Sequence, residues 1–222
     1  MSSMLLRSTI VGIAAAVLAA APAFAQPQLV EPLKPCYVVA QENQRELVTV
    51  HAAGFTALSR VDIFLDDVLQ DQPSALIDGH VKGTVRAPFE EEGTRPFTLR
   101  IAEHGAPANT VTATTMVTRL AVEQTPQRAS TAQRVRFEGR GFLTLTTPVY
   151  AHYVFAGKAR KTVRLGLPKG PCGTFSVRRK QFPFKRSPSE GRWTIQFDQH
   201  PQYDPKAAVR VPMTIRVRRT AG

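Results

Sequence analysis

The chain has 222 residues, and 29 lysines and arginines against 17 aspartates and glutamates give it a formal net charge of +12. This length allows two domains of about 100 residues each, and a strongly basic balance favours anionic partners. Long runs of helix formers with a 3.6-residue period are absent, which excludes a helical bundle.

The first 25 residues predict a secretory signal peptide. Arg7 supplies the positive charge, residues 10–21 form the apolar stretch, and Ala23-Phe24-Ala25 is a cleavage site of the A-x-A type. The stretch is short for a bilayer span, and no basic stop-transfer cluster follows it. We therefore expect cleavage after Ala25, no transmembrane segment, and secretion of residues 26–222 to the cell envelope or periplasm.

Short runs in which apolar and polar residues alternate predict β-strands through the rest of the chain. The clearest runs are 97–101, 193–197 and 213–217, and their period of two is typical of a strand with one face on a core. Trp193 shares the apolar phase of its run and is predicted to face the core. In chain order, strands are expected near residues 36–41, 46–51, 61–66, 74–79, 82–87, 96–102, 110–117, 119–124, 133–138, 148–156, 160–166, 173–178, 192–198 and 208–218.

These expected strands fall into two sets of seven with matching landmarks. Residues 83–85 (Gly-Thr-Val) match 173–175 (Gly-Thr-Phe), and residues 97–99 (Phe-Thr-Leu) match 193–195 (Trp-Thr-Ile). A spacing of about 90 residues corresponds to one β-sandwich domain. The sequence therefore predicts an all-β protein with domain 1 at 26–118 and domain 2 at 119–222, joined without a linker.

A motif at the end of the second strand of each set gives a family resemblance. The pattern Val-x-Val-x-x-x-Gly-Phe-Thr resembles bacterial extracellular immunoglobulin-like and fibronectin-III-like domains, in which the glycine lets the chain bend and the aromatic fills the sandwich. The resemblance implies two tandem immunoglobulin-like domains but does not choose a function. The matching residues are Val48, Val50, Gly54, Phe55 and Thr56 in domain 1, and Val135, Phe137, Gly141, Phe142 and, one place later than the pattern, Thr144 in domain 2.

Two cysteines, Cys36 and Cys172, belong to different predicted domains. Export permits a disulfide, and two remaining cysteines of an exported chain often pair. In a linear tandem, however, Cys36 is expected at the pole remote from domain 2, and Cys172 in an exposed turn. A bridge would then require domains folded back on each other, since cysteines with Cα atoms more than about 7 Å apart cannot be joined. Both outcomes stay open.

No motif of a known catalytic or cofactor site occurs. The histidines at positions 51, 80, 104, 152 and 200 are scattered, with His51 on a solvated strand face and His152 expected to be a satisfied polar group. Aspartates 62, 66, 67 and 71 crowd one hairpin without the ordered spacing of a calcium loop. We expect no cofactor, no metal and no enzymatic activity.

Charge is divided unevenly between the predicted domains. Domain 1 has 7 lysines and arginines against 12 aspartates and glutamates, whereas domain 2 has 21 against 5. The densest segment is 178–186. Its residues 183–186 (Pro-Phe-Lys-Arg) align with the acidic segment 88–92 of domain 1, and the basic loop that contains them is eight residues longer than this acidic loop. The candidate partner-binding residues are Arg178, Arg179, Lys180, Phe182, Phe184, Lys185 and Arg186, supported by Lys158, Arg160, Lys161 and Arg164.

The leading hypothesis is an exported non-catalytic binding protein whose second domain docks on an anionic envelope polymer, an anionic lipid surface or an acidic protein. Its arginines would make bidentate contacts while Phe182 and Phe184 wedge into the interface. Nucleic acid fits the charge, but export makes it an unlikely partner. One alternative is a periplasmic assembly chaperone that offers residues 111–117 as an edge strand. Another is a structural or adhesive module in which the acidic loop of one copy meets the basic loop of the next.

Overall fold

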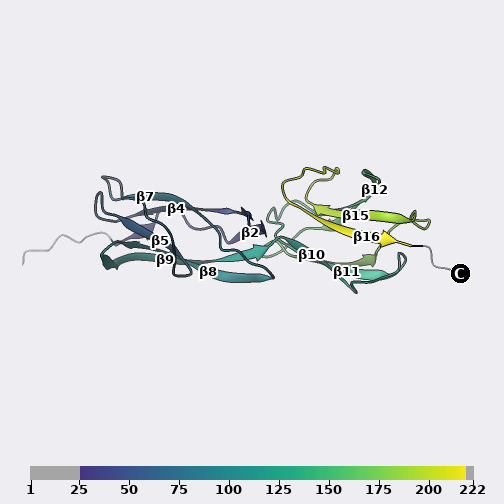
Figure 1. The fold of residues 1–222 in the computed structure, drawn as a ribbon, viewed down its shortest axis with the longest axis horizontal. Coiled ribbons are helices and arrows are strands. Elements are labelled where there is room, and N and C mark those ends of the chain that lie inside the picture. The colour runs from purple at the N-terminus through teal and green to yellow at the C-terminus, as the bar shows by residue number, and fades with distance from the viewer. Residues whose placement is uncertain (1–25, 219–222) are drawn as a thin grey trace, which may run out of the picture.

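The structure is a computed structural model that describes residues 26–218, so the predicted signal peptide lies outside the described residues. Within this range the chain is all-β, with 16 strands in four sheets and no helix. The described residues therefore contain no helix long and apolar enough to cross a membrane. Figure 1 shows an elongated molecule in which β1 to β9 form one body and β10 to β16 form another, placed end to end.

The N-terminal body (26–119) consists of two sheets that share one core. Alternate side chains of both sheets, such as Val48, Ile63 and Phe97, are fully buried between them. One sheet has the order β1 (Gln28–Leu29), β4 (Leu47–Ala53) and β7 (Val81–Arg86). The other has the order β3 (Gln44–Arg45), β2 (Cys36–Gln41), β9 (Ala106–Arg119), β8 (Thr94–Glu103), β5 (Val61–Leu65) and β6 (Val68–Asp71).

The C-terminal body (120–218) has the same plan around a second, separate core that includes Phe137, Tyr153 and Phe197. The three-stranded sheet has the order β10 (Ala121–Thr125), β11 (Arg134–Arg140) and β14 (Phe175–Lys180). The four-stranded sheet has the order β13 (Lys158–Gly166), β12 (Val149–Phe155), β15 (Gly191–Asp198) and β16 (Arg210–Val217). β13 and β14, consecutive in the chain, are thus edge strands of different sheets.

Thirteen of the fourteen predicted strands overlap an observed strand, but the sequence did not predict β6 or the two-residue strands β1 and β3. Trp193 is 3% exposed, which confirms its predicted core-facing phase. The strand expected at 74–79 is wrong: this segment is a loop with one isolated bridge at Ser74, and the fourth strand is β6 instead. All four residues of β6 are exposed, so no burial pattern marks it in the sequence.

The glycine–aromatic motif has the predicted geometry in both bodies. Gly54 and Gly141 have φ angles of 94° and 89°, a region that side chains with a Cβ disfavour. The following residues, Phe55 and Phe142, are buried in the two cores. The glycine therefore turns the chain at the strand end so that the aromatic ring enters the sandwich.

The two bodies are joined with only Leu120 between β9 and β10. The Leu120 amide donates to the Val39 carbonyl of the first body at 2.8 Å, while its side chain belongs to the second core. Val38 and Ala40 of β2 also pack against the second core. Contacts on both sides of the connection therefore replace a linker.

A disulfide joins Cys36 to Cys172 across this junction, with a Cα–Cα distance of 5.2 Å. The expected position of Cys36 at the remote pole was wrong, because β2 runs parallel to the end of β9 and places Cys36 opposite Met116 near the junction. The expected exposure of Cys172 was also wrong: it is 4% exposed, and its carbonyl accepts from the Gly141 amide at 2.9 Å. The bridge therefore forms without any folding back (Figure 1).

Candidate functional site

The cationic candidates lie on the two edge strands of the C-terminal body and on the loop that follows them. Arg179 is half-buried and the other eight are exposed: Lys158, Arg160, Lys161 and Arg164 on β13, Arg178 and Lys180 on β14, and Lys185 and Arg186 in the loop. The Lys161 ammonium donates to the Pro183 carbonyl and lies 5.8 Å from the centroid of the Phe184 ring. The β13 edge is therefore attached to the loop that leaves β14.

Two further arginines, which sequence reasoning missed, complete this surface. β11 and β14 pair with Arg134 opposite Lys180 and Arg136 opposite Arg178. All four side chains are exposed, because the intervening Val135 faces the core. We call these four residues the cationic quartet, and together with the nine candidates they form the basic surface.

The quartet concentrates charge in a small area. Side chains directly opposite each other on neighbouring strands have Cβ atoms about 4.5–5.5 Å apart, and like charges there repel. Residues two apart on one strand are about 6.6 Å apart. Glu138 lies 3.7 Å from Arg136 and offsets part of the charge. The remaining positive field attracts anions with closely spaced charges.

The signal for the missed arginines was present in the sequence. Arg134 and Arg136 occupy the polar phase of the strand predicted at 133–138. Charge density along the chain does not reveal them, since they are 42 or more residues from Arg178. Pairing the predicted strands 133–138 and 173–178 as antiparallel neighbours would have brought them together.

The two phenylalanines of the basic loop do not form an exposed wedge, which corrects that expectation. Phe182 is 3% exposed and Phe184 is half-buried. Both rings lie 5.4 Å from the Trp193 ring, and Phe184 lies 5.8 Å from Tyr153. Burial of two large aromatic side chains is favourable, so the loop folds over the open end of the sandwich. The phenylalanines thus anchor the loop and position its cations.

Hydrogen bonds at the base of the loop add to this anchoring. The buried Gln181 side chain donates to the Gln124 side chain at 3.0 Å, and its backbone amide donates to the Gln133 carbonyl at 2.8 Å. The Phe182 amide donates to the Thr131 carbonyl at 3.1 Å. The residues between Lys180 and Lys185 are therefore fixed by both their backbone and their side chains.

Arg179 differs from its neighbours because it faces inward. Burial raises the pKa of the Tyr153 hydroxyl, and the positive charge of Arg179 opposes that rise. Tyr153 therefore stays neutral in the physiological range, and Arg179 contributes to the field between the sheets more than to the exposed surface.

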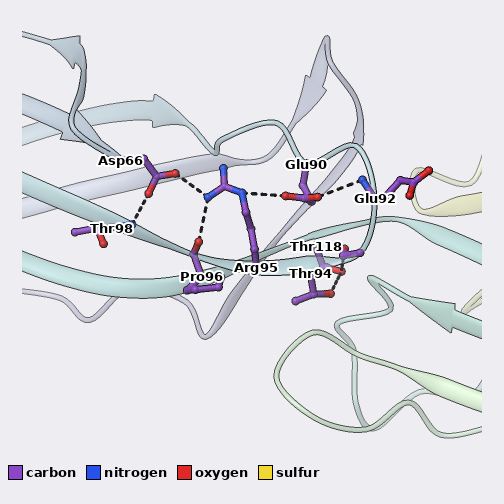
Figure 2. Close-up of polar contacts among 9 residues, drawn as sticks. Asp66, Glu90, Glu92, Thr94, Arg95, Pro96, Thr98 and Thr118 are labelled. Carbon is purple, nitrogen blue, oxygen red and sulfur yellow. Dashed lines mark hydrogen bonds and ion pairs between the residues drawn. The ribbon is translucent and has the colours of Figure 1, made fainter.

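The acidic loop of the first body lies at the internal junction rather than at a free pole. Figure 2 shows Arg95 held between Glu90, at 2.9 Å, and Asp66, at 2.7 Å. Glu91 and Glu92 are exposed and help to line a groove of about 1010 Å³ beside β10. The acidic loop thus faces the second body of its own chain.

The segment proposed as a chaperone edge is covered only in part on the side away from β8. Residues 111–117 lie within β9, which pairs with β8 on one side. On the other side, Met116 and Val117 pair with β2, and the Thr115 hydroxyl donates to the Lys34 carbonyl at 2.5 Å. A partner strand would have to displace these contacts at residues 115–117, whereas among the described residues no strand pairs with 111–114 on this side.

Among the histidines, His152 has the structural environment expected of it. It is fully buried, with Nδ1 2.9 Å from the Thr162 hydroxyl and Nε2 3.1 Å from the Asp198 carboxylate. His51 is not the solvated side chain that was expected, because it is 19% exposed and lies next to His80. Within residues 26–218 no three or more His, Cys, Asp or Glu side chains are grouped to hold a metal ion.

No protein-family model matches this sequence, and no curated protein matches it. Among solved structures, it is similar to the Bacteroides ovatus mixed-linkage glucan utilization locus SGBP-B in complex with a mixed-linkage heptasaccharide. The sequence identity is 11% and the TM-score is 0.25, and the match covers 87% of this chain and 48% of that chain. The chain thus spans about half of that protein's length.

Proposed function

We propose that this protein is an exported, non-catalytic binding protein of the cell envelope that docks on an anionic polymer through its basic surface. Ten of the eleven cations of this surface, all but Arg179, have exposed side chains, and one of these ten, Lys161, donates to the Pro183 carbonyl. They lie on strands and on an anchored loop, so the backbone that carries them loses little conformational entropy when a ligand binds. The cationic quartet is the observation that carries this proposal.

We propose further that the two bodies are tandem immunoglobulin-like domains exported by the signal peptide. Each body has a three-stranded sheet facing a larger one and its own core. Each also has a glycine that bends the chain directly after a strand, Gly54 after β4 and Gly141 after β11. The buried disulfide suits an oxidising compartment outside the cytoplasm. Mass spectrometry of the exported protein is expected to show a chain that begins at Gln26, and an intact Met1 start would contradict export by cleavage.

A polymer is favoured over a lipid surface because the aromatic residues of the loop are committed to the core. Phe182 cannot insert into a bilayer without leaving its contacts with Trp193. A lattice of cations on a sheet face matches an extended chain with repeated phosphate or carboxylate groups, each of which accepts charge-assisted hydrogen bonds from arginine.

The test uses inorganic polyphosphate, polygalacturonate and vesicles containing phosphatidylglycerol as probes. Exposed charges are screened over about 10 Å at 0.1 M salt, so binding to the polymers is expected to weaken steeply as salt rises. Replacing Arg134, Arg136, Arg178 and Lys180 with serine is expected to weaken polymer binding by about tenfold or more at low salt. Replacing the loop and edge cations Arg178, Arg179, Lys185 and Arg186 with serine is expected to weaken it as well.

The matched control removes four exposed cations elsewhere, Lys82, Arg86, Arg128 and Lys206, and so causes the same loss of net charge. It is expected to weaken binding much less than the quartet variant does. Equal losses of polymer affinity in both variants would show that binding depends on net charge alone. Unchanged binding in the quartet variant would overturn the proposal. Salt-resistant binding to the vesicles alone would assign the surface to lipid instead.

A further inference from the structure

A pair of histidines lies at the pole of the N-terminal body away from the junction, with one ring nitrogen of each within hydrogen-bond distance of the other. His51 lies on β4, and His80 immediately precedes β7, its neighbour in the sheet. The distance between His51 Nε2 and His80 Nδ1 is 3.1 Å. Both side chains are half-buried, and each presents one ring nitrogen to the other.

This separation fits two imidazole ligands of one metal ion. Zinc–nitrogen bonds are about 2.0–2.1 Å long, so nitrogens 3.1 Å apart subtend an angle of about 95–102° at the metal. That value lies between the right angle of tetragonal sites and the tetrahedral angle, which suits Cu²⁺, Ni²⁺ or Zn²⁺. The ring centroids are 5.3 Å apart with an interplanar angle of 43°, so the two nitrogens face each other and the rings must rotate to direct both lone pairs at one ion.

A carboxylate lies on the opposite side of His51. Glu31 lies 3.6 Å from His51 Nδ1 and favours a proton on that nitrogen. His51 Nε2 then carries a lone pair directed at His80. A carboxylate behind a ligating imidazole is the usual second-shell arrangement of metal-binding histidines.

The backbone holds all three residues in place. The Val30 amide donates to the His51 carbonyl at 2.9 Å, which fixes the segment carrying Glu31 beside β4. The Leu76 amide donates to the His80 carbonyl at 2.7 Å, and the His80 amide donates to Asp78 Oδ1 at 3.1 Å. Lys82 lies opposite His51 in the strand register and is exposed, so its charge is screened by solvent.

We propose that His51 and His80 bind a first-row divalent metal ion, with Glu31 as the partner that orients His51 and water completing the coordination. Cu²⁺ is expected to bind most tightly, ahead of Zn²⁺ and Ni²⁺, in keeping with the general order of affinities of divalent ions for nitrogen ligands. The site is independent of the basic surface, which lies on the other body.

The experiment titrates the untagged protein with Cu²⁺, and separately with Zn²⁺, by calorimetry in a non-coordinating buffer near neutral pH. His80→Asn and His51→Gln are each expected to weaken Cu²⁺ binding by about tenfold or more, because a chelate becomes a single imidazole. Glu31→Gln removes the carboxylate next to the ligating His51 and is expected to weaken Cu²⁺ binding by about tenfold. Zn²⁺ is expected to shift the imidazole NMR signals of His51 and His80 selectively.

His104→Asn is the matched control, because His104 also contacts a carboxylate, Asp62 at 2.9 Å, but has no second imidazole within hydrogen-bond distance among the described residues. It is expected to leave Cu²⁺ affinity unchanged. If His51→Gln unfolds the body, His80→Asn, which changes a turn residue, still decides the result. Equal Cu²⁺ affinity of the parent and His80→Asn, or an equal loss in His104→Asn, would overturn the proposal.

Discussion

Cys36 and Cys172 are 136 residues apart in sequence, yet their side chains form a buried disulfide between the two bodies. The same junction is crossed by the main chain at Leu120, so two covalent connections join the bodies. One connection permits a hinge, whereas two connections restrict rotation about it. The disulfide therefore fixes how the basic surface is held relative to the N-terminal pole.

The disulfide is expected to contribute both stability and stiffness. Cys36→Ser combined with Cys172→Ser should lower the free energy of unfolding by roughly 2–5 kcal/mol, because the bridge closes a long loop in the unfolded chain. Small-angle scattering should show a broader distribution of shapes. A reductant should reproduce both effects in the parent and change nothing in the variant. An unchanged melting temperature and scattering profile would show that the noncovalent contacts at Leu120 suffice.

Reversing one charge of the cationic quartet is expected to raise folding stability and to weaken anion binding. Lys180→Glu turns the repulsive pair with Arg134 into an attractive one, which should stabilise the fold by about 0.5–1 kcal/mol. The same change should weaken binding to polyphosphate. Lys185→Glu is the control, since Lys185 lies in a loop with no cation opposite it in a strand pair: it should weaken binding without raising stability. Thermal melts and titrations of the two variants decide between these outcomes, and a destabilised Lys180→Glu protein would refute the pairing.

Trp193 is expected to be the main anchor of the basic loop. Its ring contacts Phe155, Phe182 and Phe184, and its indole N–H donates to the Ser189 carbonyl at 2.8 Å. Trp193→Ala should cost about 3–5 kcal/mol of unfolding free energy. Trp193→Phe keeps most of the burial and should cost much less. Red-shifted, freely quenched tryptophan fluorescence in the native parent would contradict the burial on which this prediction rests.

Asp198 is expected to make folding stability depend on pH in the acid range. Burial alone raises its pKa, but hydrogen bonds from His152, Gln196 and the His200 amide more than offset this, so the pKa of Asp198 lies below its ordinary value of 3.8. A depressed pKa contributes stability above the unfolded value, about 3.9, and that contribution is lost as pH falls through the lower folded value. Asp198→Asn should therefore destabilise the protein at pH 7 by about 1–3 kcal/mol.

The difference between the parent and Asp198→Asn should shrink in denaturant titrations as pH falls below about 3.9. Asp204→Asn, a change at an exposed carboxylate nearby, should leave the pH profile close to that of the parent. A constant difference down to the lowest pH would show that Asp198 acts through shape and not through its charge.

The sequence by itself determined the elements whose signal is local. Alternation of apolar and polar residues placed the strands and the inward phase of Trp193, because a period of two follows from the geometry of one strand. The bend at Gly54 and Gly141 was likewise readable, since a positive φ is a property of one residue. β6 was not predicted because all four of its residues are exposed, so its apolar and polar residues do not alternate between a buried and a solvated face.

Only the tertiary structure decided the features that depend on which strands are neighbours. The quartet exists because β11 and β14 pair in one register, the disulfide because β2 runs parallel to β9, and the His51–His80 contact because β4 lies beside β7. The burial of Phe182 depends on the loop closing over a core built from distant strands. Each of these is set by packing between segments far apart in the chain, and no local pattern of residues encodes such a distance.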